Sequence, residues 1–287
     1  MYMEMEKKVK IISDSTSDLS KELYEKYDVS VIPLPVTLGT DSFLDGISVT
    51  PEDLYNYYNT TKKLPKTAAP AAFTYREEFE KWTSQGYAII CFTIGSGFSV
   101  SNTNARMAAE DLEDVYVIDP KNLSTGIGLM IVQAAEWAEE GVPAKEIAAR
   151  LEVMRDKVEA SFVINNLEFL WKGGRCSGVT ALGANVLRLK PCIEVVDGKM
   201  SVGKKYRGNL SACLKNYVKD RLAGRTDIDT HRLFITHSGM DQSDLVPAVW
   251  EAVEQYQHFD EILFTHANCT VCTHCGPNTL GILFVRK

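Results

Sequence analysis

The sequence predicts a two-domain α/β protein, with a parallel sheet in an N-terminal α/β domain and a mixed sheet in a C-terminal α+β domain. The chain has 287 residues, which is longer than the usual length of a domain with a single hydrophobic core. In the first half, short apolar segments alternate with segments of helical periodicity, which is typical of a parallel sheet covered on both faces. In the second half, the strand-like segments are less regularly spaced. We expect the first domain at residues 1–160 and the second at residues 161–287.

The N-terminal domain is expected to alternate between strands and helices. Thr50 should cap a helix, with Pro51 at its first position and Asp53 at the capping-box position. The expected strands are residues 9–13, 29–38, 87–93 and 114–120, and the expected helices are 20–27, 50–59, 74–85, one that ends near 112, 124–141 and 144–158.

The C-terminal domain is expected to mix strands with two amphipathic helices. The dipeptide Asp197-Gly198 lies between two apolar segments and predicts the turn of a β-hairpin. The expected strands are residues 159–164, 192–202 (the hairpin), 232–237, 261–267 and 281–287, and the expected helices are 209–224 and 241–257.

Composition and charge narrow the class of function. The net charge of −7 argues against nucleic-acid binding, which needs a basic face to displace counterions. No apolar run approaches the roughly 20 residues that span a bilayer. The N-terminal segment lacks the apolar core of a signal peptide, so we expect a cytoplasmic protein. Seven cysteines, an odd number, do not favour a disulfide framework in such a protein.

Three polar segments are expected to meet at one edge of the parallel sheet. "SDSTSD" follows the first strand, "KTAAP" precedes a helix, and "IGSGFSVS" follows the strand at 87–93. Ligands of open parallel sheets bind beyond the carboxyl ends of the strands, so convergence of these segments favours a binding site. Each segment taken alone is equally well explained as helix capping. The glycine loop lacks the third glycine of GxGxxG, and neither GK[ST] nor GxSxG occurs, so nucleotide-phosphate and α/β-hydrolase chemistry have little support.

Two segments of the C-terminal half could also carry chemistry. In "FLWKGGRCSG", Arg175 follows two glycines and presents a planar fork suited to a carboxylate or phosphate, although a solvated arginine at a helix end is the simpler alternative. In "HANCTVCTHCGPNTLG", Cys269, Cys272, His274 and Cys275 could bind a metal, could be incidental thiols in a loop, or could place His274 in a site at the Gly-Pro turn. No second half-site lies at a finger-like distance, so no metal site is expected.

Taken together, these motifs resemble the DegV family of bacterial fatty-acid-binding proteins over nearly the whole chain. The segments that carry the resemblance are "IISDSTSDL", "VIPLPVTL", Asp45-Gly46, "TAAP", "IGSGFSVSNTNARMAA", "VIDP", "LEFLWKGGR", "LKPCIEVVDGKM" and "HCGPNTLG". The resemblance implies a DegV-like fold of two α/β domains with a long-chain fatty acid between them as the ligand and no cofactor. It also implies that the protein is not catalytic alone, and that it carries the acyl chain for a separate ATP-binding fatty acid kinase subunit, whose acyl phosphate feeds phospholipid synthesis. A transient contact with membranes is compatible with that role.

The resemblance also implies roles for single residues. By motif position, Thr67, Ser96 and Ser99 would hold the fatty acid carboxylate. Arg175 and His274 would lie near the head group and support phosphoryl transfer.

The chain departs from the family pattern at Ala68, Gly95, Val100-Ser101, Pro120 and Asn278, so fewer hydroxyls surround the expected head group. Two other classes of function remain as alternatives. One is an autonomous hydrolase that uses Ser96 or His274. The other is a metal- or redox-responsive interaction protein that uses Cys269, Cys272 and Cys275.

Overall fold

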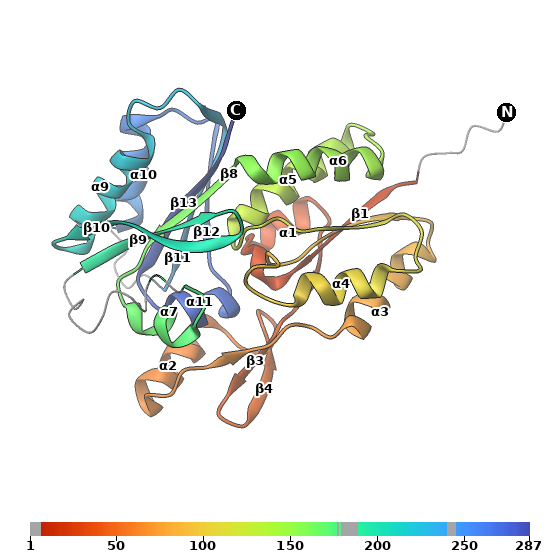
Figure 1. Ribbon diagram of the computed structural model, residues 1–287, viewed down its shortest axis with the longest axis horizontal. Helices are drawn as coiled ribbons and strands as arrows, with labels where there is room; N and C mark the ends of the chain where they lie inside the picture. Colours follow the sequence, from red (N-terminus) through yellow and green to blue (C-terminus); the bar gives the residue numbers. More distant parts are fainter. Residues whose placement is uncertain (1–6, 177, 179–188, 240–244) are drawn as a thin grey trace.

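The computed structural model describes residues 7–176, 178, 189–239 and 245–287, and it has two α/β domains (Figure 1). The helices are α1 (Lys21–Lys26), α2 (Pro51–Thr61), α3 (Ala72–Thr83), α4 (Ser101–Ala109), α5 (Thr125–Glu139), α6 (Ala144–Met154), α7 (Leu167–Gly173), α9 (Leu210–Leu222), α10 (Leu245–Tyr256) and α11 (Cys269–Cys275). The strands are β1 (Val9–Asp14), β2 (Ser30–Ile32), β3 (Pro35–Leu38), β4 (Asp41–Leu44), β5 (Lys66–Thr67), β6 (Ala88–Phe92), β7 (Val115–Ile118), β8 (Val158–Val163), β9 (Leu189–Val196), β10 (Lys199–Arg207), β11 (Ile228–Ser238), β12 (Glu261–His266) and β13 (Thr279–Arg286).

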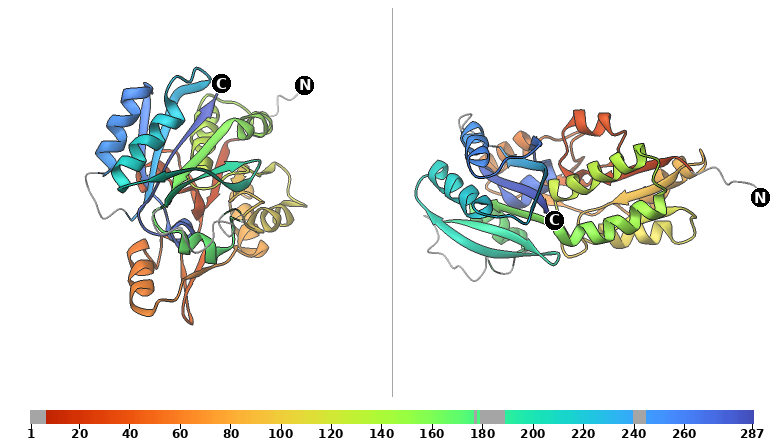
Figure 2. Two further views of the ribbon diagram at one scale, coloured as in Figure 1. Left: turned by 60° about the vertical axis from the view of Figure 1, so that its left-hand side comes forward. Right: turned by 90° about the horizontal axis from the view of Figure 1, so that it is seen from above.

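The N-terminal domain is a four-stranded parallel sheet between two layers of helices, as the sequence predicts. Its strand order is β2-β1-β6-β7. Alternate side chains of a strand point to opposite faces, so Ile11 and Ile90 pack with α1, α5 and α6, whereas Ile12 and Ile89 pack with α3 and α4. Figures 1 and 2 show α5 and α6 on one side of this sheet and α3 and α4 on the other.

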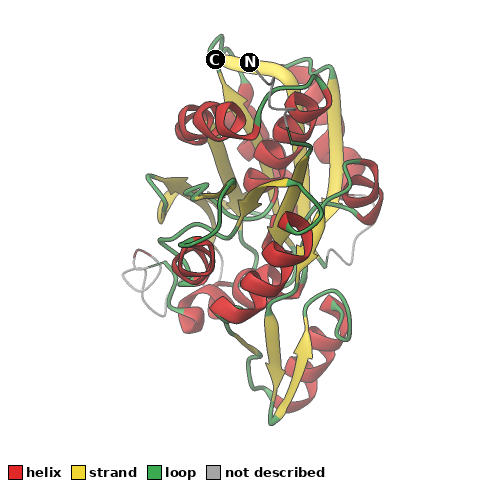
Figure 3. Ribbon diagram, turned by 90° about the vertical axis from the view of Figure 1, so that its right-hand side faces the viewer, coloured by secondary structure: helices red, strands yellow, loops and turns green. Residues whose placement is uncertain are grey.

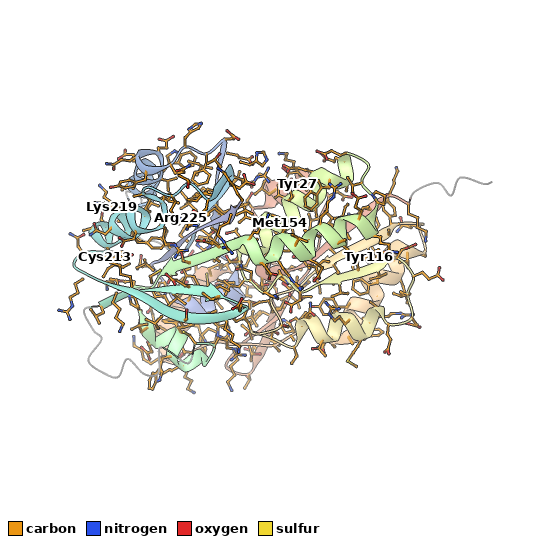
Figure 4. All side chains as sticks on the ribbon, turned by 45° about the horizontal axis from the view of Figure 1, so that its top comes forward. Tyr27, Tyr116, Met154, Cys213, Lys219 and Arg225 are labelled. Carbon is orange, nitrogen blue, oxygen red and sulfur yellow. The ribbon has the colours of Figure 1, made fainter. Side chains whose placement is uncertain are left out.

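The C-terminal domain is a six-stranded mixed sheet, which confirms the predicted class. Its order is β10-β9-β8-β13-β11-β12, with β11 and β12 parallel and the other neighbours antiparallel. Helices α9 and α10 cover one face, and α5 of the first domain packs on the other face, against β8, β11 and β13. In Figure 4, the labels Cys213 and Lys219 mark α9 of the C-terminal domain, and Met154 and Tyr116 mark α6 and β7 of the N-terminal domain. Strand β8 belongs to the second sheet and runs across the expected domain boundary at residue 160.

The segment 29–38 is not one strand, and that prediction is wrong. Strand β2 ends at Ile32 in the parallel sheet, and β3 begins at Pro35 in a separate antiparallel sheet of order β4-β3-β5. Pro33 and Pro35 explain the break because proline has no N–H to donate to a ladder. This small sheet and α2 project from the body of the molecule (Figure 3).

Local signals in the sequence are otherwise confirmed closely. Thr50 and Asp53 form a reciprocal capping box at the start of α2. Asp197 and Gly198 join β9 to β10 with φ values of 49° and 72°, as expected for a two-residue hairpin turn. Of the predicted helix 241–257, residues 241–244 lie outside the described residues. The segment 269–275 is the short helix α11 rather than a loop.

Candidate functional site

A cavity of about 60 Å³ lies at the junction of the two domains and gathers most of the predicted site residues. Thr67 comes from β5, Ser99 from the loop between β6 and α4, Arg175 from the end of α7, and His274 from α11. Apolar side chains complete the lining, among them Leu34, Ile94, Phe98, Leu123 and Val271. The cavity therefore has hydroxyl, imidazole and guanidinium groups within an apolar wall.

Thr67 and His274 form the central contact of this cavity. Thr67 Oγ1 lies 2.9 Å from His274 Nε2, although the two residues are 207 positions apart. Burial, and to a smaller extent the nearby Arg175 guanidinium, lower the pKa of His274 to about 4. The imidazole is therefore neutral at pH 7. Its other ring nitrogen, Nδ1, is buried and has no hydrogen-bond partner among the described residues.

The end of α7 places Arg175 at the cavity. Gly173 packs against the imidazole so closely that a Cβ there would lie 2.6 Å from His274 Nδ1. Gly174 ends the helix in the left-handed conformation, with φ of 69°, which glycine adopts without strain. The Arg175 side chain is exposed, and its Nη1 donates to the Gly173 carbonyl at 2.6 Å. Glycine is thus required at 173 to leave space for the His274 ring, and it is favoured at 174 by the left-handed turn.

Ser96 and Ser99 lie in the same loop but face different partners. Ser99 lines the cavity, and its Oγ lies 2.9 Å from Ser101 Oγ. Ser96 is exposed and does not line the cavity; its Oγ donates to Asp119 Oδ2 at 2.5 Å, and its N–H donates to the other carboxylate oxygen at 3.0 Å. Partial burial of Asp119 favours its neutral form, but the bonds from Ser96, the N–H of Lys121 and the charge of Arg155 together outweigh burial and lower the pKa of Asp119. Carboxylate binding by Ser96 stays a prediction.

Helix α11 is held in place by two buried carboxylates of the first domain. Asp18 accepts a hydrogen bond from the N–H of Asn268 at 2.8 Å. Asp45 accepts from the N–H groups of Cys269 and Thr270 at 2.7 and 3.0 Å. These are the first N–H groups of the helix, which have no partners within it. The first domain therefore caps the helix that carries His274.

The "SDSTSD" segment does not line the cavity, and its buried acidic side chains form hydrogen bonds with neighbouring loops and with the start of α11. Asp14 accepts from the N–H groups of Thr16 and Ile94, and Asp18 accepts from Ser124 Oγ at 2.6 Å. Burial raises the pKa of Asp14 to about 6 and that of Asp18 well above its usual range. The sequence signal was the cluster of acids and hydroxyls itself, but it did not distinguish a ligand site from an anchor between domains.

A second cavity of about 30 Å³ adjoins the first and is lined by residues of both domains. Both cavities are lined by Leu123, Val271 and Cys275, and the second also by Phe162 and Leu283. The hydroxyls that border it are bonded elsewhere, for example Thr279 Oγ1 to the Cys275 carbonyl at 3.0 Å. The cavity that bears the predicted head-group residues therefore adjoins a second cavity whose lining is mainly apolar, with His237 as the one ionisable side chain other than Cys275 among its described lining residues.

The cysteines of α11 are core residues. Cys269, Cys272 and Cys275 are all buried, and burial raises their thiol pKa values. Among the described residues, no group of three or more His, Cys, Asp or Glu side chains is arranged to hold a metal ion. The hydrolase alternative named Ser96 or His274, and these two residues are not paired with each other: Ser96 bonds Asp119, whereas His274 bonds Thr67.

Comparison with known proteins identifies the family. Residues 8–287 match the family model described as "Uncharacterised protein, DegV family". The chain belongs to the DegV family. A DegV domain-containing protein of Clostridium perfringens is 30% identical over 285 residues, which cover 98% of this chain and 99% of that protein.

Solved DegV structures have the same fold. A Thermus thermophilus DegV family protein, described by its fatty acid binding, is 25% identical, has a TM-score of 0.88, and matches 98% of this chain and 100% of its own. A stearic acid-binding protein from Eubacterium ventriosum is 26% identical, with a TM-score of 0.80 and coverage of 97% and 98%. In the described part of this DegV chain, no helix has the length and apolar character needed to cross a membrane.

Proposed function

We propose that this DegV protein binds a long-chain fatty acid between its two domains and presents the carboxylate to a separate ATP-dependent fatty acid kinase subunit. The observation that carries the proposal is that the cavity bearing Thr67, Ser99, Arg175 and His274 shares three lining residues with a second, mainly apolar cavity between the domains. An amphipathic ligand with one anionic end matches this division. DegV relatives described as fatty-acid-binding proteins support it.

Hydrophobic transfer supplies the affinity in this proposal. Each buried CH₂ contributes roughly 0.8 kcal/mol, so a chain of about 16 carbons gains on the order of 10 kcal/mol before the costs of ordering it. The cavities of about 60 and 30 Å³ have room for a few water molecules, not for an alkyl chain of that length. Binding must therefore part the apolar side chains between the domains, with Leu123 and Val271 the first to move because both cavities share them.

The carboxylate is proposed to be held by the hydroxyls of Thr67 and Ser99. One hydrogen bond to a charged group contributes about 1.5–3 kcal/mol, which is enough to fix the position of the chain but small beside its burial. Arg175 lies at the exposed rim, where a guanidinium can stabilise charge on a transferring phosphoryl group. The chain contains no Walker motif, so ATP is expected to come from the partner.

Lipid extraction and titration test the binding function. Purified protein should release a fatty acid on denaturing extraction, and delipidated protein should bind long-chain acids in calorimetry. Thr67→Val and Ser99→Ala should each weaken binding at least tenfold, since tenfold corresponds to about 1.4 kcal/mol. Thr60→Val removes an exposed hydroxyl of α2 and is the matched control. Ser96→Ala belongs in the same series, because its role is a separate prediction.

Two results would contradict this function. Protein that extracts free of lipid and binds no long-chain acid is not a fatty acid carrier. Unchanged affinity in Thr67→Val, Ser99→Ala and the double variant would mean that the carboxylate is held elsewhere. Kinase coupling is tested separately, by trapping acyl phosphate with hydroxylamine in the presence of a DegV-associated ATP-binding subunit. Arg175→Ala should keep the lipid but lower the rate at least tenfold, whereas Arg207→Ala, an exposed arginine of β10, should not.

A further inference from the structure

The two ring nitrogens of His274 have different surroundings, and this difference determines where its proton resides. Nε2 lies 2.9 Å from Thr67 Oγ1, whereas Nδ1 is buried without a partner among the described residues. A neutral imidazole carries one proton, on one nitrogen or the other. The hydrogen bond made by the ring normally fixes the choice.

The unpartnered nitrogen is more stable as a bare lone pair than as an N–H. A buried N–H without an acceptor is rarer in proteins, and costlier, than a buried acceptor without a donor. Nδ1 lies beside Gly173, where a Cβ would come within 2.6 Å of it, and no described group is placed to bond it, so an N–H at this position would have no acceptor. The proton therefore belongs on Nε2, which then donates to Thr67 Oγ1.

This assignment determines what Thr67 can do. A hydroxyl that accepts a hydrogen bond from the imidazole keeps its own hydrogen free to donate to another group. Thr67 lines the cavity, so that other group is the ligand carboxylate of the proposed function. With the opposite tautomer, Thr67 would donate to Nε2 and would offer the carboxylate no hydrogen.

We propose that His274 is a positioning residue for Thr67, donating from Nε2–H so that the Thr67 hydroxyl hydrogen is directed to the carboxylate, and that Gly173 provides the space for the ring in this orientation. The lipid part of this inference rests on the proposed function, whereas the tautomer does not. The neutral imidazole also means that His274 contributes to the head group through Thr67 rather than as a cation.

Nitrogen-15 NMR of histidine-labelled protein tests the tautomer directly. The chain has five histidines, and the His274→Gln spectrum identifies the His274 signals. We expect Nδ1 at the shift of an unprotonated ring nitrogen and Nε2 at that of a protonated one, with or without lipid. A protonated Nδ1 overturns the proposal, and so does a spectrum of an imidazolium at pH 7. If the wild type binds no fatty acid, the proposed function fails, but these resonances still decide the tautomer.

Affinity measurements test whether the donor matters. Glutamine can supply an N–H near the position of Nε2, so His274→Gln should keep fatty acid affinity within about threefold, whereas His274→Leu should lose about tenfold. In the Thr67→Val background, the two His274 variants should bind alike, which a merely structural role of the ring would not produce. Equal affinities of the Gln and Leu variants in the wild-type background would overturn the proposal.

The role of Gly173 is tested by comparing a substitution there with one at the neighbouring Gly174. Gly173→Ala should shift the His274 resonances and weaken binding at least fivefold in protein that remains folded by circular dichroism. Gly174→Asn is the matched control, because residue 174 has no neighbour within 4 Å of its Cβ position and asparagine tolerates the left-handed conformation. Unperturbed His274 resonances in Gly173→Ala would refute the part assigned to Gly173.

Discussion

Replacing Asp45 by alanine should destabilise the protein far more than the removal of an exposed carboxylate would. Asp45 is 2% exposed, and its carboxylate accepts hydrogen bonds from the N–H groups of Cys269 and Thr270 and from Ser15 Oγ at 2.9 Å. In Asp45→Ala, both N–H groups at the start of α11 stay buried without an acceptor. The serine hydroxyl can rotate to another partner, so we count only the two N–H groups.

The expected size of the effect follows from these two groups. Each unsatisfied buried N–H costs roughly 1–3 kcal/mol, which gives about 2–6 kcal/mol for the pair. Removal of the buried carboxylate returns part of its own desolvation cost, so we expect a net loss of about 2–4 kcal/mol. Asp45→Asn keeps one acceptor oxygen and should lose roughly half as much. The total stability of a natural protein is about 5–15 kcal/mol, so Asp45→Ala should be readily detected.

Urea unfolding, followed by far-UV circular dichroism and by tryptophan fluorescence, measures this loss. Coincidence of the two transitions is required before a single free energy of unfolding is assigned to a two-domain chain. Asp41→Ala is the matched control, because Asp41 is exposed in the neighbouring strand β4 and its replacement should change stability by less than about 0.5 kcal/mol. An Asp45→Ala protein as stable as the control would refute the view that the first domain caps α11.

Three further outcomes follow from other parts of the structure. A Cβ at Gly97 would lie 2.1 Å from the Gly198 carbonyl oxygen, so Gly97→Ala must displace the β9–β10 turn and should lower both the melting temperature and fatty acid affinity; unchanged values in both measurements would contradict this contact. Burial lowers the pKa values of His237 and His274 from 6.5 to about 4, so protonation favours the unfolded chain. The contribution of each residue is complete above pH 6.5 and is lost as the pH falls toward 4. At pH 5 the loss is about 2 kcal/mol for the buried His274 and smaller for His237, which solvent partly screens. Urea titrations at pH 7 and pH 5 measure this loss, and His274→Gln should remove its share. Elemental analysis of protein purified without added metal should find no stoichiometric zinc; a zinc signal lost together with folding in Cys269→Ser would revive the metal-site alternative.

The sequence predicted those features that depend on short-range physics. The capping box at Thr50 and Asp53 needs residues three apart, and the turn at Asp197 and Gly198 needs two residues that tolerate positive φ. The parallel sheet was predicted for the same reason, because the hydrophobic periodicity of each strand and helix can be recognised within that segment alone. The positions of Thr67 and His274 in one site came from the family resemblance, and their contact across 207 positions could not be worked out from either segment alone.

The features that the sequence did not reveal depend on distant partners. Helix α11 has seven residues, too few to be stable in isolation, and its N-terminal groups are satisfied by Asp18 and Asp45 from the other domain. Nothing within 269–275 indicates those partners. The sheet β4-β3-β5 was missed because β5 has two residues and forms only by pairing with β3.

This small sheet has a consequence for the geometry of the site. Asp45 follows β4 directly, and Thr67 is in β5 of the same sheet, where it is paired with Val36 of β3. Asp45 holds the first turn of α11, and Thr67 bonds His274 in the last turn of that helix. Helix α11 is thus attached at both ends to one three-stranded sheet, which fixes the distance between the hydroxyl and the imidazole. Helix α11 also lines both cavities through Val271 and Cys275. A lipid that enters between the domains must therefore either displace α11 together with the small sheet or bend its own alkyl chain around the helix. Asp45→Ala should therefore disturb the His274 resonances as well as stability, although Asp45 does not line the cavity.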